Sequence, residues 1–114
     1  MVDNSDTVYD LDQLKNMYEY LDKNGDLFYI VYKNTLIGDC AIFDDKMVAI
    51  VIDKEYRGNG IGSKVLEFLI SYARNMGYEN LNAEIYDFNM VSKNLFTKYG
   101  FKNTRGNIYS LSLN

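Results

Sequence analysis

The fold is decided by residues 50–63, which read IVIDKEYRGNGIGS. An apolar, strand-like run leads into a loop with three glycines, Gly58, Gly60 and Gly62, and then directly into the apolar periodicity of a helix. Glycines let consecutive backbone N–H groups converge on one point, and the first N–H groups of a helix have no partner within it. We therefore predict an anion site at this loop, to which the helix dipole contributes about 0.3–1 kcal/mol.

Two familiar phosphate-binding loops fit this stretch less well. A Walker A loop needs Gly-Lys followed by Ser or Thr, whereas Ser63 precedes Lys64 here, which excludes it. A dinucleotide-binding loop would need Gly or Ala at Ser63 and a longer series of alternating strands and helices, although Asp87 stands where a ribose-binding acid would. The dinucleotide loop remains an alternative, as does a flexible connection that holds no ligand.

The segments upstream of this stretch predict a meander preceded by a helix. Three runs rich in aromatic and β-branched residues are separated by breaks short enough for hairpins only. These runs lie at residues 27–33, 36–43 and 46–53. Further upstream, a capping Asp10 and apolar residues at helical spacing predict a short helix that ends at Asn24 and Gly25.

The segments downstream predict two helices, one strand and a hairpin. The longest helix runs from Ile61 to Met76, and a second runs from about Asn89 to Lys98. The strand between them, residues 81–86, lies parallel to the strand before the loop if a right-handed crossover joins the two. A hairpin over 101–103 and 108–113 ends the chain. The predicted architecture is α+β, a single three-layer domain over 1–114 with a mixed, mostly antiparallel sheet flanked by helices, in the order α-βββ-α-β-α-ββ.

Composition excludes several classes of function. The 114 residues carry 12 basic and 16 acidic side chains, a net charge of −4, so nucleic acid is not an expected partner. The chain has no His, which removes Ser-His-Asp and Cys-His catalysis and nearly every zinc site, so we expect no metal. No apolar run is long enough for a membrane span, and the first residues do not resemble a secretory signal. The lone Cys40 is consistent with the cytoplasm.

The loop also resembles a known family. Its sequence is similar to the coenzyme A loop of the GNAT superfamily of N-acetyltransferases, whose signature is Arg/Gln-x-x-Gly-x-Gly/Ala; Arg57, Gly60 and Gly62 match it. A second segment, residues 89–101, resembles the family's Asn-x-x-Ala-x-x-x-Tyr-x-x-x-Gly-Phe pattern. Together with Gly38, which stands where these proteins often have Gly, the resemblance covers about residues 27–113 and implies the GNAT fold.

The resemblance implies that the cofactor is acetyl-CoA, held mainly by the backbone. The strand residues Ile50, Val51 and Ile52 would pair with the strand-like pantetheine arm. The pyrophosphate would lie on the loop and helix start, with charge supplied by Arg57. These loop residues are Gly58, Asn59, Gly60, Ile61, Gly62 and Ser63. Asn89 and Phe96 would contact the cofactor from the second helix.

Transfer to an amine requires a base, an oxyanion donor and a proton source. The resemblance places Glu84 as the general base, although a solvated carboxylate on the polar face of a strand is an equal explanation, and it places the Ile52 N–H as the oxyanion donor. The family's usual proton-donating Tyr is Phe96 here. Tyr99, three residues later, is our expected substitute; water, the substrate ammonium and Tyr86 are alternatives.

The function implied is acetyl-CoA-dependent N-acetyl transfer to a primary amine of a protein, a peptide or a small molecule by direct attack. A non-catalytic acyl-CoA-binding sensor or regulatory module is the first alternative, and an interaction module without nucleotide ligand is the second. Only 26 residues precede the first predicted strand, so the family's first strand and one of its helices are expected to be missing. The acceptor side would then be open, which favours a protein amine, or completed by a second copy in a homodimer.

Overall fold

The computed structural model describes residues 8–12, 15–22 and 25–114. The elements in chain order are β1 (Val8–Asp12), β2 (Lys15–Asp22), β3 (Gly25–Tyr32), β4 (Thr35–Phe43), β5 (Val48–Ile52), the 3-10 helix η1 (Lys54–Tyr56), α1 (Ile61–Asn75), β6 (Asn80–Glu84), α2 (Met90–Lys98), β7 (Lys102–Arg105) and β8 (Ile108–Ser112). Neither α1 nor α2, the α-helices in this part of the chain, is long and apolar enough to cross a membrane.

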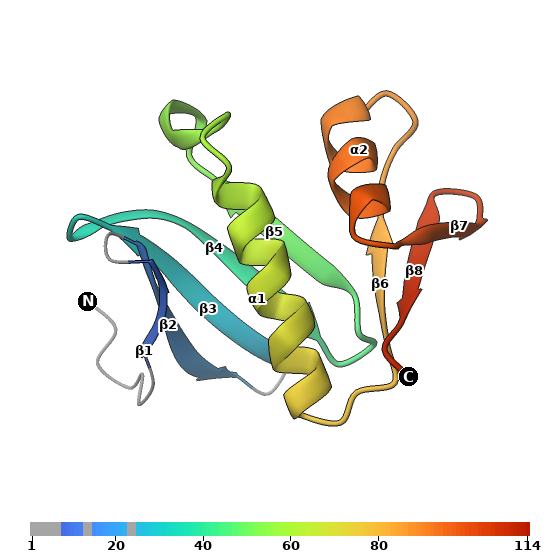
Figure 1. Ribbon diagram of the computed structural model, residues 1–114, viewed down its shortest axis with the longest axis horizontal. Coiled ribbons are helices and arrows are strands. Elements are labelled where there is room, and N and C mark those ends of the chain that lie inside the picture. The colour runs from blue at the N-terminus through green and yellow to red at the C-terminus, as the bar shows by residue number, and fades with distance from the viewer. Residues whose placement is uncertain (1–7, 13–14, 23–24) are drawn as a thin grey trace.

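The strands form two sheets that meet at one end. A five-stranded antiparallel sheet has the order β1-β2-β3-β4-β5, and a three-stranded antiparallel sheet has the order β6-β8-β7. Among the residues that the structure describes, one isolated parallel bridge, between Met47 and Asn82, connects the sheets. From that point β5 and β6 diverge, α1 crosses the larger sheet, and α2 lies on the smaller one (Figure 1).

From residue 25 onward the predicted order of elements is confirmed. The three-strand meander, both helices and the C-terminal hairpin are present, and their boundaries agree with the sequence pattern to within a few residues. The parallel relation predicted for the strand before the loop and the strand after the long helix is also present. It extends over the single bridge only, because the two strands separate immediately beyond it.

The prediction of a helix between Asp10 and Asn24 is wrong. The described residues of this segment form β1 and β2, and β2 pairs with β3 along its whole length, from Lys15 opposite Tyr32 to Asp22 opposite Gly25. A strand edge offers hydrogen-bond partners to every second backbone group, and this tertiary pairing overrides a weak local helical pattern. The inference that no strand precedes residue 27 is therefore wrong as well. Residues 13–14 and 23–24 of the predicted helix lie outside the described residues.

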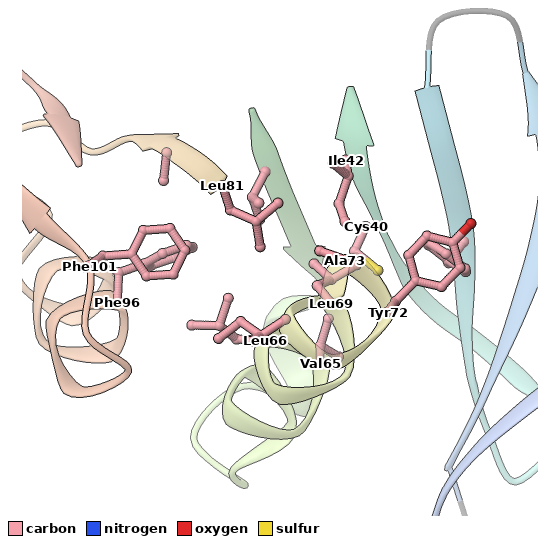
Figure 2. Close-up of a cluster of buried hydrophobic side chains, with 14 of the residues drawn as sticks. Cys40, Ile42, Val65, Leu66, Leu69, Tyr72, Ala73, Leu81, Phe96 and Phe101 are labelled. Atoms are coloured by element: carbon pink, nitrogen blue, oxygen red, sulfur yellow. The ribbon is translucent and has the colours of Figure 1, made fainter. Parts of the chain in front are cut away.

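The core lies between α1 and the two sheets (Figure 2). The buried face of α1 contributes Val65, Leu66, Leu69 and Ala73, each fully shielded from solvent. On one side these residues face the larger sheet, and on the other side the core continues to Leu81, Phe96 and Phe101. The rings of Phe96 and Phe101 meet edge-on with centroids 5.0 Å apart, which fixes α2 against the start of β7. The core therefore sets the position of both helices that border the space between β5 and β6.

Gly38 allows β4 and β5 to approach closely. It lies opposite Ile52, and a Cβ atom at this position would stand 2.1 Å from the carbonyl oxygen of Val51, closer than any real contact. The clash is with backbone, which cannot rotate away as a flexible side chain can. Glycine is thus required here by space, and the path of β5 depends on it.

We expect Gly38→Ala to lower the free energy of unfolding by about 1–3 kcal/mol, because β5 must shift to admit the methyl group. The measurement is the melting temperature without ligand. Gly62→Ala is the matched control, since its Cβ would lie 3.5 Å from Leu95 Cδ2, an ordinary contact, on a helix where Ala is the better former. A Gly38→Ala protein as stable as the wild type would contradict the assignment.

Candidate functional site

A groove of about 940 Å³ occupies the space between the diverging strands. Its walls are β5 on one side and the end of β6 on the other, and the starts of α1 and α2 border it. Most of the residues that the sequence predicts for a cofactor site line this groove. They are Ile50, Val51, Ile52, Arg57, Gly58, Gly62, Ser63, Asn89 and Phe96, and the predicted base Glu84 joins them.

The edge of β5 presents backbone donors to the groove. The N–H of Asp53 donates to the carbonyl oxygen of Ile37 on β4 at 2.7 Å, so Asp53 faces its partner strand. Because successive residues of a strand alternate in direction, the N–H groups of Ile52 and Ile50 point away from β4, toward β6. β6 has already diverged at this height, so an extended ligand can pair with this edge as an added strand would.

The start of α1 presents a second set of backbone donors. Its N-cap is Gly60 at φ 78°, which has no side chain to cap the first turn, and that turn contains no acidic residue. Gly58 is also left-handed, at φ 82°, and no heavy atom lies within 4 Å of the place a Cβ would occupy at either glycine. The first N–H groups of α1 are therefore aligned at an open, uncapped helix end, which attracts anions.

Three of the predicted loop residues, Asn59, Gly60 and Ile61, do not line the groove wall itself. The Asn59 side chain turns back and donates from Nδ2 to the carbonyl oxygen of Tyr56 at 3.5 Å. The Ile61 side chain is 3% exposed and belongs to the core, so only its backbone faces the loop. Both residues shape the turn, and the sequence pattern had no means of separating this role from direct contact.

Arg57 closes the end of β5. Its Nε donates to the carbonyl oxygen of Ile52 at 3.0 Å, which holds the guanidinium beside the free strand edge. Arg57 is exposed and lines the groove, so its remaining N–H donors stay accessible to a charged ligand. This bond places one positive charge between the two sets of backbone donors.

The wall formed by α2 is mostly apolar. Asn89 is the N-cap of this helix, and its Oδ1 accepts from the Ser92 N–H at 3.1 Å, which leaves the Nδ2 half of the carboxamide for a ligand. Phe96 is 7% exposed, so it belongs to the core as much as to the groove. Leu95 and Ser92 also line the groove and were not predicted. They follow Asn89 at helical spacing, which is the signal that could have identified them.

The wall formed by the end of β6 contributes a carboxylate and a phenol hydroxyl to the groove. Glu84 is exposed and is the last residue of β6, and Tyr86, half-exposed, lines the groove two residues later. The Tyr86 ring stacks on Phe88 with centroids 5.8 Å apart and planes parallel to within 1°. Phe88 is 84% exposed, and no sequence pattern distinguished it from an ordinary loop residue.

Tyr99 lies outside the groove, in contrast to its predicted role. Its hydroxyl donates to Glu67 Oε2 on α1 at 2.6 Å, and this bond to a carboxylate raises the pKa of Tyr99. Tyr99 borders a separate depression, formed by α1 and the end of α2, with Glu67 and Arg74. Tyr99 therefore does not line the groove with Glu84 and Ile52, although its hydroxyl also interacts with Ser63, which does; its role as proton donor stays a prediction.

Comparison with known proteins agrees with this geometry. Residues 3–101 match the family model described as the acetyltransferase (GNAT) family. The chain is 35% identical over 85 residues to YwnH of Bacillus subtilis (strain 168), a candidate phosphinothricin acetyltransferase, and the match covers 75% of this chain and 52% of YwnH. The chain thus spans about half the length of this relative.

Two solved structures show the same fold. A GNAT family acetyltransferase from Elizabethkingia anophelis, solved with acetyl-CoA bound, aligns with a TM-score of 0.70 at 20% identity over 78% of this chain and 76% of that one. An acetyltransferase from Salmonella typhimurium that modifies the N-terminal serine of ribosomal protein L7/L12 aligns with a TM-score of 0.72 at 12% identity, over 93% of this chain and 99% of that one.

Proposed function

The chain belongs to the acetyltransferase (GNAT) family, and on that premise we propose that it transfers an acetyl group from acetyl-CoA to a primary amine. The observation that carries the proposal is the groove between β5 and β6, which joins a free strand edge to an uncapped helix end. An amide-bearing pantetheine arm suits the first feature, and a pyrophosphate suits the second. The acceptor is an amine of a protein, a peptide or a small molecule.

The residues present fit acetyl-CoA. The N–H of Ile50 on the open edge of β5 would hold the pantetheine arm, and the Gly58–Ser63 backbone would hold the pyrophosphate beside Arg57. Acetyl-CoA, when bound, supplies an activated acetyl thioester. These donors are main-chain groups, so a chain with a net charge of −4 can still bind a polyanion at one local site.

Three groups of this chain have roles in the reaction that we propose. The Ile52 N–H donates to the negative charge that develops on the thioester oxygen. The Glu84 carboxylate accepts the proton of the incoming ammonium, because it is exposed within the groove and can reach a bound amine directly or through water. The Tyr86 hydroxyl replaces the absent family tyrosine as proton donor to the thiolate. It belongs to the groove wall, whereas the hydroxyl of Tyr99 is engaged with Glu67.

We expect acetyl-CoA to raise the melting temperature of the wild type by several degrees, since ligand at 100 times its Kd adds about 2.7 kcal/mol of stability. Ser63→Asp should abolish this shift by placing a carboxylate at the proposed phosphate site. Ser63→Asn, similar in size but uncharged, should keep most of it. The new carboxylate would stand four residues before Glu67 on α1, so a small fall in the apo melting temperature is expected, and each shift is measured from the variant's own apo value. No shift for the wild type at millimolar acetyl-CoA would contradict the proposal.

We expect Glu84→Gln to lower the rate of acetyl transfer about 100-fold or more while the acetyl-CoA shift in melting temperature is retained, because the amide cannot accept the proton. The rate is measured by the release of free coenzyme A thiol with a panel of peptide and small-molecule amines. Glu79→Gln, on the exposed residue before β6, is the matched control and should be unchanged. An unchanged rate in Glu84→Gln would contradict the role of general base and indicate that Glu84 is an ordinary solvated side chain on the polar face of β6.

We expect Tyr86→Phe to slow the same reaction by about 10²–10⁴-fold, the usual contribution of a general acid. Tyr99→Phe should leave the rate within a factor of two or so of the wild type, since its hydroxyl faces Glu67 outside the groove. The opposite result, with only Tyr99→Phe inactive, would restore the role that the sequence suggested for Tyr99.

A further inference from the structure

One residue, Asn82, makes the contacts that join the two sheets at the closed end of the groove. Its backbone N–H donates to the carbonyl oxygen of Lys46 at 2.8 Å, and its Nδ2 donates to that of Asp45 at 3.4 Å. Its Oδ1 accepts from the Ser110 hydroxyl on β8 at 2.6 Å. The side chain of Asn82 therefore ties the turn between β4 and β5 to two strands of the other sheet.

The turn that receives these bonds is itself held firmly. Asp45 Oδ1 accepts from the Met47 N–H at 3.0 Å, which fixes the turn internally. The Lys46 ammonium lies 4.4 Å from the centre of the Tyr78 ring, and the Tyr78 hydroxyl donates to Asp26 on β3. The turn that carries both carbonyl oxygens is thus fixed relative to the larger sheet. The hydrogen bonds of Asn82 therefore set the position of β6 relative to that sheet.

The groove begins immediately beside this contact. Its closed end is lined by Met47 and Ala83, the neighbours of the bridging residues, and its open end by Ile52 and Tyr86. Asn82 itself does not line the groove. Because the strands diverge from this point, a small displacement of β6 at Asn82 would produce a larger change in the β5–β6 separation at the open end of the groove.

We propose that Asn82 is a positioning residue that sets the separation of β5 from β6 and thereby the affinity for acetyl-CoA. The inference rests on the proposed function for its ligand. The Nδ2 bond to the Asp45 carbonyl oxygen joins β6 to the turn before β5, and the Ser110 bond, which lies within the smaller sheet, orients the Asn82 carboxamide for it. Together they fix the distance of Ala83 and Glu84 from the N–H groups of Ile50 and Ile52. Without them the walls keep the Asn82 N–H bond to Lys46 and their core contacts, but the side-chain link to the turn is lost, and a ligand must itself restrict more of their separation when it binds.

The test compares Asn82→Ala with Asn80→Ala, a control two residues earlier on the same face of β6, by calorimetric titration with acetyl-CoA. We expect Asn82→Ala to raise the Kd about tenfold with the stoichiometry still one, because two modest hydrogen bonds are lost. Asn80→Ala should bind as the wild type does. Ser110→Ala removes one of the two bonds and should give a smaller increase, and it carries the test if Asn82→Ala does not fold.

A merely structural role would lower the stoichiometry or the melting temperature and leave the Kd unchanged, and that result would overturn the proposal. Amide hydrogen exchange without ligand gives a second, independent measurement. It should be faster in Asn82→Ala at residues 83–85 and unchanged at the β3–β4 pairing, and equal exchange at 83–85 would also overturn the proposal. If the wild type itself binds no acetyl-CoA, the proposed function fails, while the exchange measurement still decides the role of Asn82.

Discussion

The structure depends on the separation of two neighbouring strands that are joined at one end only. β5 is paired on one side with β4, and its other edge would be covered in a continuous sheet. Beyond the Met47–Asn82 bridge this edge is left open, and the helices α1 and α2 pack so that their starts border the resulting space. A strand edge with free N–H groups is costly in most proteins and is usually covered. Under the proposed function, acetyl-CoA covers this edge.

Much of the site follows from the sequence because local chemistry dictates it. The glycines of residues 58–62 permit left-handed backbone before a helix, and only a narrow set of structures uses that combination. The alternation of apolar residues from 27 to 53 likewise admits little besides a meander. The start of the second helix near Asn89 was predictable from the sequence pattern, and Asn89 is its N-cap, whereas its place in the site was implied by the family resemblance alone.

The rest depends on contacts between distant segments, which a sequence pattern does not record. The segment before residue 25 has helical spacing, yet its pairing with β3 decides its structure. Tyr99 has the right chemistry for a proton donor, but the packing of α2 on α1 turns it toward Glu67. The three contacts of Asn82 join segments up to 37 residues apart, and no motif surrounds it.

Because the hydrogen-bond donors of the groove are main-chain groups, they also limit how amino-acid substitutions can change the site during evolution. A side-chain substitution cannot remove the N–H of Ile50, Ile52 or the first turn of α1; only proline does so, and the sequence contains none. The groove walls are therefore free to vary in size and polarity while the donors persist. Under the proposed function, exchanging exposed groove residues such as Val91 would alter the choice of amine while the same main-chain donors hold the cofactor.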